Sequence, residues 1–321
     1  MSIGALGFAQ NQDETYIEEA VAMKRAVSVS LGSSKRNKAV EVELLGEKIS
    51  IERIGTDGDM EKAAQLYKEL DGKVDAFGVG GADLGLMVDE KWYPLHSVNS
   101  MVRFIKQTPF VDGTGLKNTL EKRAVPFMHA KIGDYIKEKK AFVTLGADRW
   151  GLSKSFLDNG YECIFGDLMF GLGLPFALHS EKALKRMAAI AMPIAGRLPF
   201  EWVYPTGEKQ ELRVPKWEKF YQWGTVIGGD CHYVKRHIPD GMDGKIVITN
   251  TTTPDDVELF RSVGIKYLIT ATPVLEGRSF GTNMMEAALI AISGKGRKLS
   301  YDELNQLLDT LGFEPQIQEL N

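Results

Sequence analysis

The sequence predicts an α/β protein with two α/β domains, of which the C-terminal one is a doubly wound, Rossmann-like parallel sheet. Short apolar runs of strand length alternate with helical patterns in the second half, an order typical of a parallel sheet covered on both faces. The 321 residues are enough for about two domains of ordinary size. Glycine accounts for 33 residues, and extra glycine indicates tight turns or backbone that lies close to a ligand.

The first half predicts an α/β unit with an antiparallel component. Its expected strands span residues 27–31, 40–44, 49–54, 74–79 and 110–111. An amphipathic helix begins after Asp59, the expected N-cap, and ends at Gly72; a second helical pattern begins near Leu116. The first complete strand starts only after Met23, so we expect the preceding residues to be a loosely docked extension.

The second half predicts strands at residues 141–145, 161–165, 225–227, 245–249 and 267–270. Thr253 and Pro254 begin the helix after the fourth of these strands, and Ser300 caps a final helix that Gly312 ends. A charged run at 137–140 indicates a domain boundary. We therefore expect an extension at residues 1–22, an N-terminal α/β domain at 23–135 and a Rossmann-like domain at 136–321.

Composition excludes several classes of protein. Hydrophobic residues make up 44% and charged residues 26%, which is typical of a globular protein and not of a disordered one. The net charge of −4 argues against a nucleic-acid partner. Two cysteines cannot form a disulfide framework, and no apolar run reaches the length of a membrane span. With no signal-peptide pattern visible, we expect a cytoplasmic protein without a membrane partner.

Polar loops follow the expected strands of the second half, where open parallel sheets bind ligands. The loop from Gly146 to Gly151, which includes Ala147 and Arg149, follows a strand and opens a helix, as a phosphate-binding loop does. Asp167 lies 21 residues after Gly146, where a Rossmann fold places the acid that binds a ribose hydroxyl. The alternative is a plain turn followed by a solvent-exposed aspartate.

His232 is the candidate proton carrier of the second half. It follows a strand end, and Asp230 lies close enough in the sequence to orient it. Cys231 and His237 add too few ligands for zinc, so no metal is expected. In the alternative interpretation, Asp230 caps the next helix and His232 lies on its first turn.

A second candidate set follows the strand at 110–111. It includes Asp112, Lys117 and Asn118, of which Lys117 and Asn118 would face an interdomain cleft if the two sheets present their strand ends to each other. Lys117 would then serve as acid or base, provided that desolvation lowers its pKa. The alternative is a capped turn with Lys117 in solvent.

Three residues complete the candidate site. Thr251 and Thr272 are expected to line the side of the cleft that would hold a nicotinamide. Arg278 would pair with a carboxylate or phosphate, or would lie in a surface loop with no ligand.

Four stretches, at residues 27–34, 53–59, 111–119 and 277–283, resemble bacterial sequences labelled quinate 5-dehydrogenase. The resemblance covers nearly all of the chain after Met23. It implies NAD(P)-dependent oxidation of a cyclic polyol acid, with an N-terminal substrate domain and a C-terminal Rossmann domain. Ser28 and Ser30 echo the Ser-x-Ser substrate motif of that family, whereas the loop at 146–151 differs from its glycine- and alanine-rich cofactor loop.

The resulting hypothesis is an NAD(P)-dependent oxidoreductase acting on a small hydroxylated acid in the cleft. Lys117, with Asp112 or His232, would move the proton. The loop at 146–151 and Asp167 would hold the cofactor, and the carboxylate favours NAD over NADP. Two alternatives stay open: a transferase or epimerase with a nucleotide-linked substrate, and a non-catalytic ligand-binding protein. A homodimer is one assembly that the sequence permits.

Overall fold

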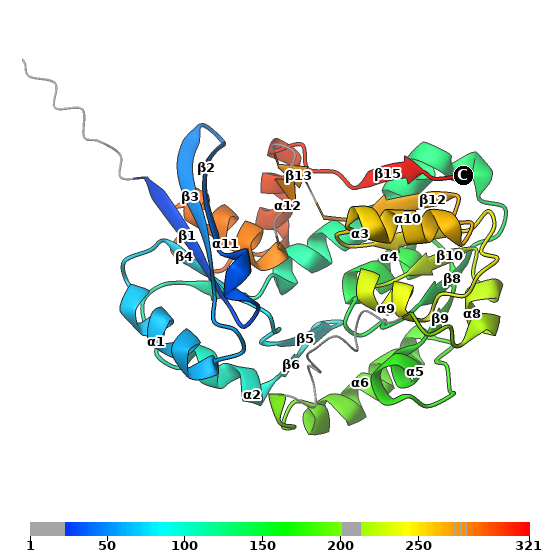
Figure 1. Ribbon diagram of the computed structural model, residues 1–321, viewed down its shortest axis with the longest axis horizontal. Coiled ribbons are helices and arrows are strands. Elements are labelled where there is room, and N and C mark those ends of the chain that lie inside the picture. The colour runs from blue at the N-terminus through cyan, green and yellow to red at the C-terminus, as the bar shows by residue number, and fades with distance from the viewer. Residues whose placement is uncertain (1–22, 201–212, 273, 276–277, 280) are drawn as a thin grey trace, which may run out of the picture.

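The computed structural model describes residues 23–200, 213–272, 274–275, 278–279 and 281–321 (Figure 1). Two main sheets, of five and six strands, organise these residues. The predicted extension at 1–22 lies outside the described part of the chain. No helix in that part is long and apolar enough to span a bilayer.

The first sheet has the strand order β2-β3-β1-β4-β7. Strand β1 lies between β3 and β4 and is parallel to both, whereas β2 is antiparallel to β3. This is the predicted α/β unit with an antiparallel component. The bounds are β1 (Lys24–Ser30), β2 (Lys38–Leu44), β3 (Glu47–Gly55), β4 (Ala76–Gly80) and β7 (Phe110–Val111).

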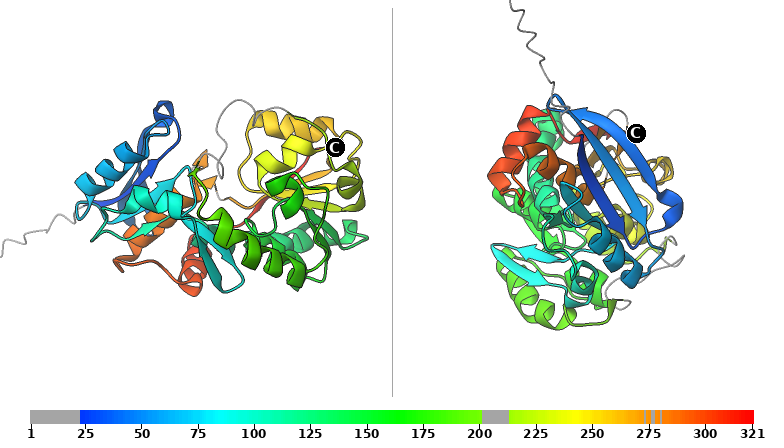
Figure 2. Two further views of the ribbon diagram at one scale, coloured as in Figure 1. Left: turned by 90° about the horizontal axis from the view of Figure 1, so that it is seen from below. Right: turned by 90° about the vertical axis from the view of Figure 1, so that its left-hand side faces the viewer.

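Helices cover both faces of this sheet because side chains alternate along each strand. Val27 and Val29 of β1 point to helix α1 (Met60–Leu70), whose Tyr67 is fully buried and donates its hydroxyl to the Val29 carbonyl at 3.0 Å. Ala26 points to the opposite face, which α11 (Thr282–Ser293) covers. Figure 2 shows α11, in orange, beside the blue strands of the first sheet.

The second sheet has the order β15-β12-β11-β10-β8-β9. Its first five strands in chain order are parallel, as predicted, and they form a doubly wound, Rossmann-like arrangement in which β8 lies between β9 and β10. The sixth, β15, is antiparallel to β12. The bounds are β8 (Lys140–Val143), β9 (Glu162–Phe165), β10 (Val226–Gly228), β11 (Ile246–Thr249), β12 (Tyr267–Thr270) and β15 (Gln316–Glu319).

Seven further helices accompany these sheets in the described ranges: α3 (Thr114–Ile132), α4 (Trp150–Asp158), α5 (Asp167–Leu172), α6 (Glu181–Ala195), α8 (Glu218–Trp223), α9 (Cys231–His237) and α10 (Pro254–Ser262). Smaller elements are α2 (His96–Asn99) and the strand pairs β5 (Gly85–Val88) with β6 (Lys91–Pro94), and β13 (Val274–Leu275) with β14 (Arg278–Ser279). The predicted final helix is α12 (Tyr301–Thr310), which begins with a capping box between Ser300 and Glu303.

Helix α3 joins the two sheets. Leu116 and Leu120, in its first half, pack into the core of the first sheet together with α11 and α12. Ala124 and Met128, in its second half, pack into a core of the second sheet. Helices α11 and α12 therefore lie with the first sheet, although the expected boundary near residue 135 assigns them to the second domain. That boundary stays a prediction.

The first turn of α11 lies directly on β4 because two β4 residues lack side chains on that face. A β-carbon added at Gly78 would lie 2.8 Å from the carbonyl oxygen of Asn283. One added at Gly80 would lie 2.8 Å from the β-carbon of Ser30. The sheet and the helix thus touch through backbone, and this contact places Asn283 against β1.

We expect Gly78→Ala to destabilise the fold by about 1–3 kcal/mol, because the new methyl group must displace the α11 backbone. Urea unfolding followed by circular dichroism measures this change. Gly133→Ala is the matched control: a β-carbon there meets nothing within 4 Å, and its effect should stay within about 0.5 kcal/mol. Equal stabilities for the two variants would contradict the close contact between β4 and α11.

Candidate functional site

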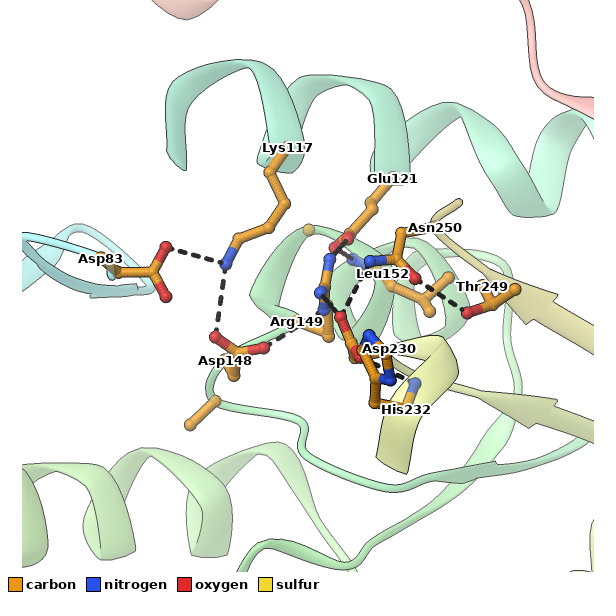
Figure 3. A network of polar contacts seen from close by, with 12 residues as sticks. Asp83, Lys117, Glu121, Asp148, Arg149, Leu152, Asp230, His232, Thr249 and Asn250 are labelled. Carbon is orange, nitrogen blue, oxygen red and sulfur yellow. Dashed lines mark hydrogen bonds and ion pairs between the residues drawn. The ribbon is translucent and has the colours of Figure 1, made fainter. Parts of the chain in front are cut away.

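The strand ends of the two sheets meet at one junction. Asp83 follows β4, Lys117 lies in the first turns of α3, and Asp148 follows β8. The Lys117 Nζ atom lies 4.0 Å from an Asp83 oxygen and 3.3 Å from an Asp148 oxygen (Figure 3). The expected juxtaposition of the two sets of strand ends is therefore present, and Lys117 is buried within it and not in solvent.

Arg149 lies at the centre of this junction and forms ion pairs with three carboxylates. Its guanidinium donates to Glu121 at 2.7 Å, lies 3.2 Å from an Asp148 oxygen through Nε, and pairs with Asp230 (Figure 3). Asn250 donates to the same Asp230 carboxylate at 2.8 Å. We call the six charged residues the junction network: Asp83, Lys117, Glu121, Asp148, Arg149 and Asp230.

The junction network changes the expected chemistry of Lys117. Burial alone would lower its pKa, but the carboxylates of Asp148 and Asp83 outweigh burial and raise that pKa above its usual value. The condition set for Lys117 as an acid or base, a lowered pKa, is therefore not met in this arrangement. Burial raises the pKa of Asp83 to about 6 despite the nearby Lys117. Asp83 was not among the residues that the sequence singled out for the site.

Little space exists inside the junction. The cavity that Lys117, Glu121, Arg149 and Thr272 help to line has a volume of about 10 Å³. A cavity of that size holds about one water molecule. This cavity is therefore too small for the ligand that the sequence interpretation expected between the two sheets.

Several N–H groups of the loop at residues 146–151 have acceptors within the chain. The N–H groups of Gly146 and Ala147 donate to the Asp167 carboxylate at 2.9 and 2.8 Å. Farther along, the Gly151 N–H donates to the Asn118 side-chain oxygen at 3.1 Å. These are the donors that such a loop would offer to a phosphate. A carboxylate of the chain already occupies the position, so Asp167 is neither solvent-exposed nor directed at a ribose.

The two glycines of this loop have a packing role. A β-carbon at Gly146 would lie 2.5 Å from the Phe165 ring, and one at Gly151 would lie 2.6 Å from the Asn118 carbonyl oxygen. Helices α3 and α4 approach closely at the second point. Asn118 is buried, and its side-chain oxygen accepts the Gly151 N–H within the fold; its predicted contact with a substrate stays a prediction.

The candidate proton carriers Asp112 and His232 lie in different parts of the fold and have different roles there. Asp112 accepts hydrogen bonds from the N–H groups of Leu84 and Thr114 at 2.7 and 3.0 Å and so shapes the turn before α3. His232 is exposed on the first turn of α9, where Asp230 accepts its N–H as N-cap. The structure thus has the arrangement of the alternative interpretation, in which Asp230 caps the helix and His232 lies on its first turn. Asp230 also pairs with Arg149 in the junction network.

The threonines and Arg278 differ in how they relate to the junction. Thr251 is exposed, whereas Thr272 is buried beside the junction cavity. Arg278 lies in β14, and its side chain is outside the described part of the structure. Within that part, no group of three or more His, Cys, Asp or Glu side chains is placed to hold a metal ion.

A pocket of about 420 Å³ opens at the ends of β1, β3 and β4. Since β1 lies between two parallel neighbours, this is a switch point of the first sheet, where open α/β sheets bind ligands. We call it the first-sheet pocket. Its polar lining comprises Ser28, Ser30, Arg36, Lys38, Arg53 and Asn283.

Hydrogen bonds order the inner wall of the first-sheet pocket. Asn283 donates to the Ser28 hydroxyl at 2.6 Å, and Arg53 donates to the Ser30 hydroxyl at 3.1 Å. Arg36 is exposed at the rim. Three of the four stretches that carry the sequence resemblance contribute to this lining, which is the signal that could have found the pocket before the loop at 146–151.

Fold and pocket together define a two-sheet α/β protein with a Rossmann-like second sheet and a polar pocket at the edge of the first. The chain belongs to the family described as domain of unknown function DUF8754, whose model matches residues 115–320. Residues 25–112 match the model of domain of unknown function DUF8753. Neither description names an activity, so the resemblance to quinate dehydrogenases stays a prediction. The chain matches no curated protein.

Distantly similar solved structures include an NAD-dependent malic enzyme from Thermotoga maritima, with 13% identity over 90% of this chain and 76% of that chain and a TM-score of 0.39. A periplasmic ribose ABC transporter from Conexibacter woesei has 8% identity over 89% and 95% of the two chains and a TM-score of 0.37. A malic enzyme from Entamoeba histolytica has 9% identity over 80% and 65%, with a TM-score of 0.33. These likenesses concern the arrangement of the chain alone.

We expect Arg149→Met to lower the free energy of unfolding by about 3–5 kcal/mol, because removing one partner leaves buried carboxylates without a counter-charge. Urea denaturation at neutral pH measures the loss. Lys154→Met is the control: Lys154 is partly exposed and pairs with Asp158 one turn away on α4, and such pairs contribute about 0.3–0.5 kcal/mol. Similar losses in both variants would show that the junction network does not hold the sheets together.

Proposed function

We propose that the protein binds a small hydroxylated acid in the first-sheet pocket. The observation that carries the proposal is the placement of basic and hydroxyl side chains around one cavity of about 420 Å³, within the usual size range of ligand pockets. Arg36 and Arg53 supply fork-shaped donors that match a carboxylate. Ser28, Ser30 and Asn283 supply short polar groups suited to the hydroxyls of the same ligand.

The electrostatics of the two candidate places support this choice. The polar residues that line the first-sheet pocket are basic or neutral. The junction network instead has four acids against two bases, and three of its six residues, Lys117, Glu121 and Arg149, are buried. An anionic ligand is attracted to the first and repelled by the second. The proposed binding place therefore differs from the loop at 146–151, whereas the ligand class, a small hydroxylated acid, is the one expected from the sequence.

Calorimetric titration of the full chain with quinate and gluconate, and with sorbitol as the uncharged comparison, tests the proposal. We expect both acids to bind and sorbitol not to. Arg36→Ala should weaken binding of the acids about tenfold, since a hydrogen bond to a charged group contributes about 1.5–3 kcal/mol.

Lys35→Ala is the matched control for Arg36→Ala. Lys35 is the exposed neighbour in the same short 3-10 helix (Ser34–Arg36), and it does not line the pocket. Its loss should leave affinity unchanged. Binding of sorbitol as tight as that of the acids, or no binding of either acid, would contradict the proposal.

An NAD(P)-dependent oxidoreductase is the second candidate. The position of β8 between β9 and β10 favours it, because this strand order creates a crevice of the kind that holds dinucleotides. The Asp167 carboxylate argues against this candidate, because it already accepts the Gly146 and Ala147 N–H groups that a dinucleotide phosphate would need. This candidate therefore requires the loop to exchange Asp167 for the ligand.

Titration with NAD and NADP, followed by protein fluorescence, separates the two roles of Asp167. If Asp167 binds a ribose hydroxyl, Asp167→Ala should weaken NAD binding. If Asp167 fills the anion position itself, we expect the wild type to show no saturable binding of either cofactor, and the variant to lose no affinity. Tight NAD binding that Asp167→Ala abolishes would restore the oxidoreductase hypothesis, with NAD as the cofactor.

A further inference from the structure

The first-sheet pocket carries a more specific inference, which rests on the proposed function. We propose that its ligand is a phosphate monoester of a polyol, with the dianionic phosphate between Arg36 and Arg53 beside Gly32. The ligand class thus shares its hydroxyls with the small acids above but carries a second negative charge.

Two guanidinium groups converge on one point of the pocket. A β-carbon at Gly32 would lie 2.8 Å from Nη2 of Arg53 and 2.9 Å from Nη2 of Arg36. Residue 32 carries no side chain, and this lets both Nη2 atoms approach the same stretch of backbone in the pocket wall. Like charges that converge in this way repel unless an anion lies between them.

Among the described residues, no carboxylate forms an ion pair with either guanidinium group. The partners of Arg53 are neutral oxygens of Ser30 and Ser33, at 3.1 and 3.0 Å. Burial and the charge of Arg36 lower the pKa of Arg53, while Asp57 opposes this effect. The positive charge of the two groups is thus only partly offset by the protein.

Charge and shape together favour a phosphate over a carboxylate. A phosphate monoester carries about 1.5–2 negative charges at neutral pH and three strong acceptor oxygens. It can therefore accept from both guanidinium forks at once, whereas a single carboxylate offers one charge and two oxygens.

The rest of the pocket indicates what the phosphate is attached to. The volume of about 420 Å³ exceeds the needs of a phosphate group alone. Its inner wall presents Ser28, Ser30 and Asn283, which are neutral and polar. Hydroxyl groups of a short polyol would extend and complete this hydrogen-bonded wall.

Calorimetric titration of the full chain with sorbitol 6-phosphate, gluconate, sorbitol and inorganic phosphate tests the inference. The first three probes share one carbon skeleton and differ in charge. We expect sorbitol 6-phosphate to bind at least about tenfold more tightly than gluconate and than inorganic phosphate. Gluconate binding as tightly as the ester would overturn the preference for phosphate while sparing the proposed function. Inorganic phosphate binding as tightly would overturn the polyol part. Binding of neither ester nor acid would overturn both proposals.

Gly32→Ala tests the position of the phosphate without removing a charge. The added methyl group would collide with both guanidinium groups and push them away from their shared position, so affinity for sorbitol 6-phosphate should fall at least about tenfold. Gly133→Ala, remote from any neighbour, should leave affinity unchanged. Circular dichroism and melting temperature check that both variants fold. If Gly32→Ala binds the ester as tightly as the wild type, the phosphate does not lie there.

Discussion

The buried guanidinium of Arg149 is the constraint on which the arrangement of the two sheets depends. It pairs with Glu121 of α3, with Asp230 after β10 and with its neighbour Asp148. Buried charges are stable only when they are paired, so these ion pairs hold the start of α4, the segment after β10 and one face of α3 together. Lys117 lies one helical turn before Glu121 and extends the same requirement to Asp83 of the first sheet. Ion pairs thus define how the elements at this junction lie relative to one another, whereas apolar packing is non-directional.

The pattern of strands was predictable because strand formation depends on local alternation and on turn residues. The five parallel strands of the second sheet, the cap at Asp230 and the capping box at Ser300 follow from such local signals. Strand β15 was not predicted, because Gln316–Glu319 is a polar edge strand with no buried residue. The pairing of α11 with the first sheet was not predicted either, since periodicity shows that a helix has an apolar face but not which sheet covers it.

The candidate site was predicted less well, for a different physical reason. The sequence placed Asp167 correctly at the end of β9, beside free N–H groups, but a buried carboxylate binds such donors itself when no stronger anion competes. Whether these N–H groups bind a side chain or a ligand depends on distances in the folded protein, which the sequence does not give. The first-sheet pocket shows the same limit: Ser28 and Asn283 are separated by 255 residues yet share a hydrogen bond. In the sequence, the one link between Ser28 and Asn283 was that both lie in stretches resembling the sequences labelled quinate 5-dehydrogenase.

The position of α11 has a consequence for how the chain is made. On the ribosome, the last strand of the first sheet is complete at Val111, whereas the helix that covers one of its faces begins only at Thr282. Throughout synthesis of the intervening chain, only the first half of α3 is available to cover Ala26, Ile49, Ile51 and their neighbours on this face. Part of an apolar sheet surface therefore waits for a helix that is made much later, and such surface favours association while it is exposed. The wall that holds Asn283 against Ser28 can be completed only after α11 has been synthesised.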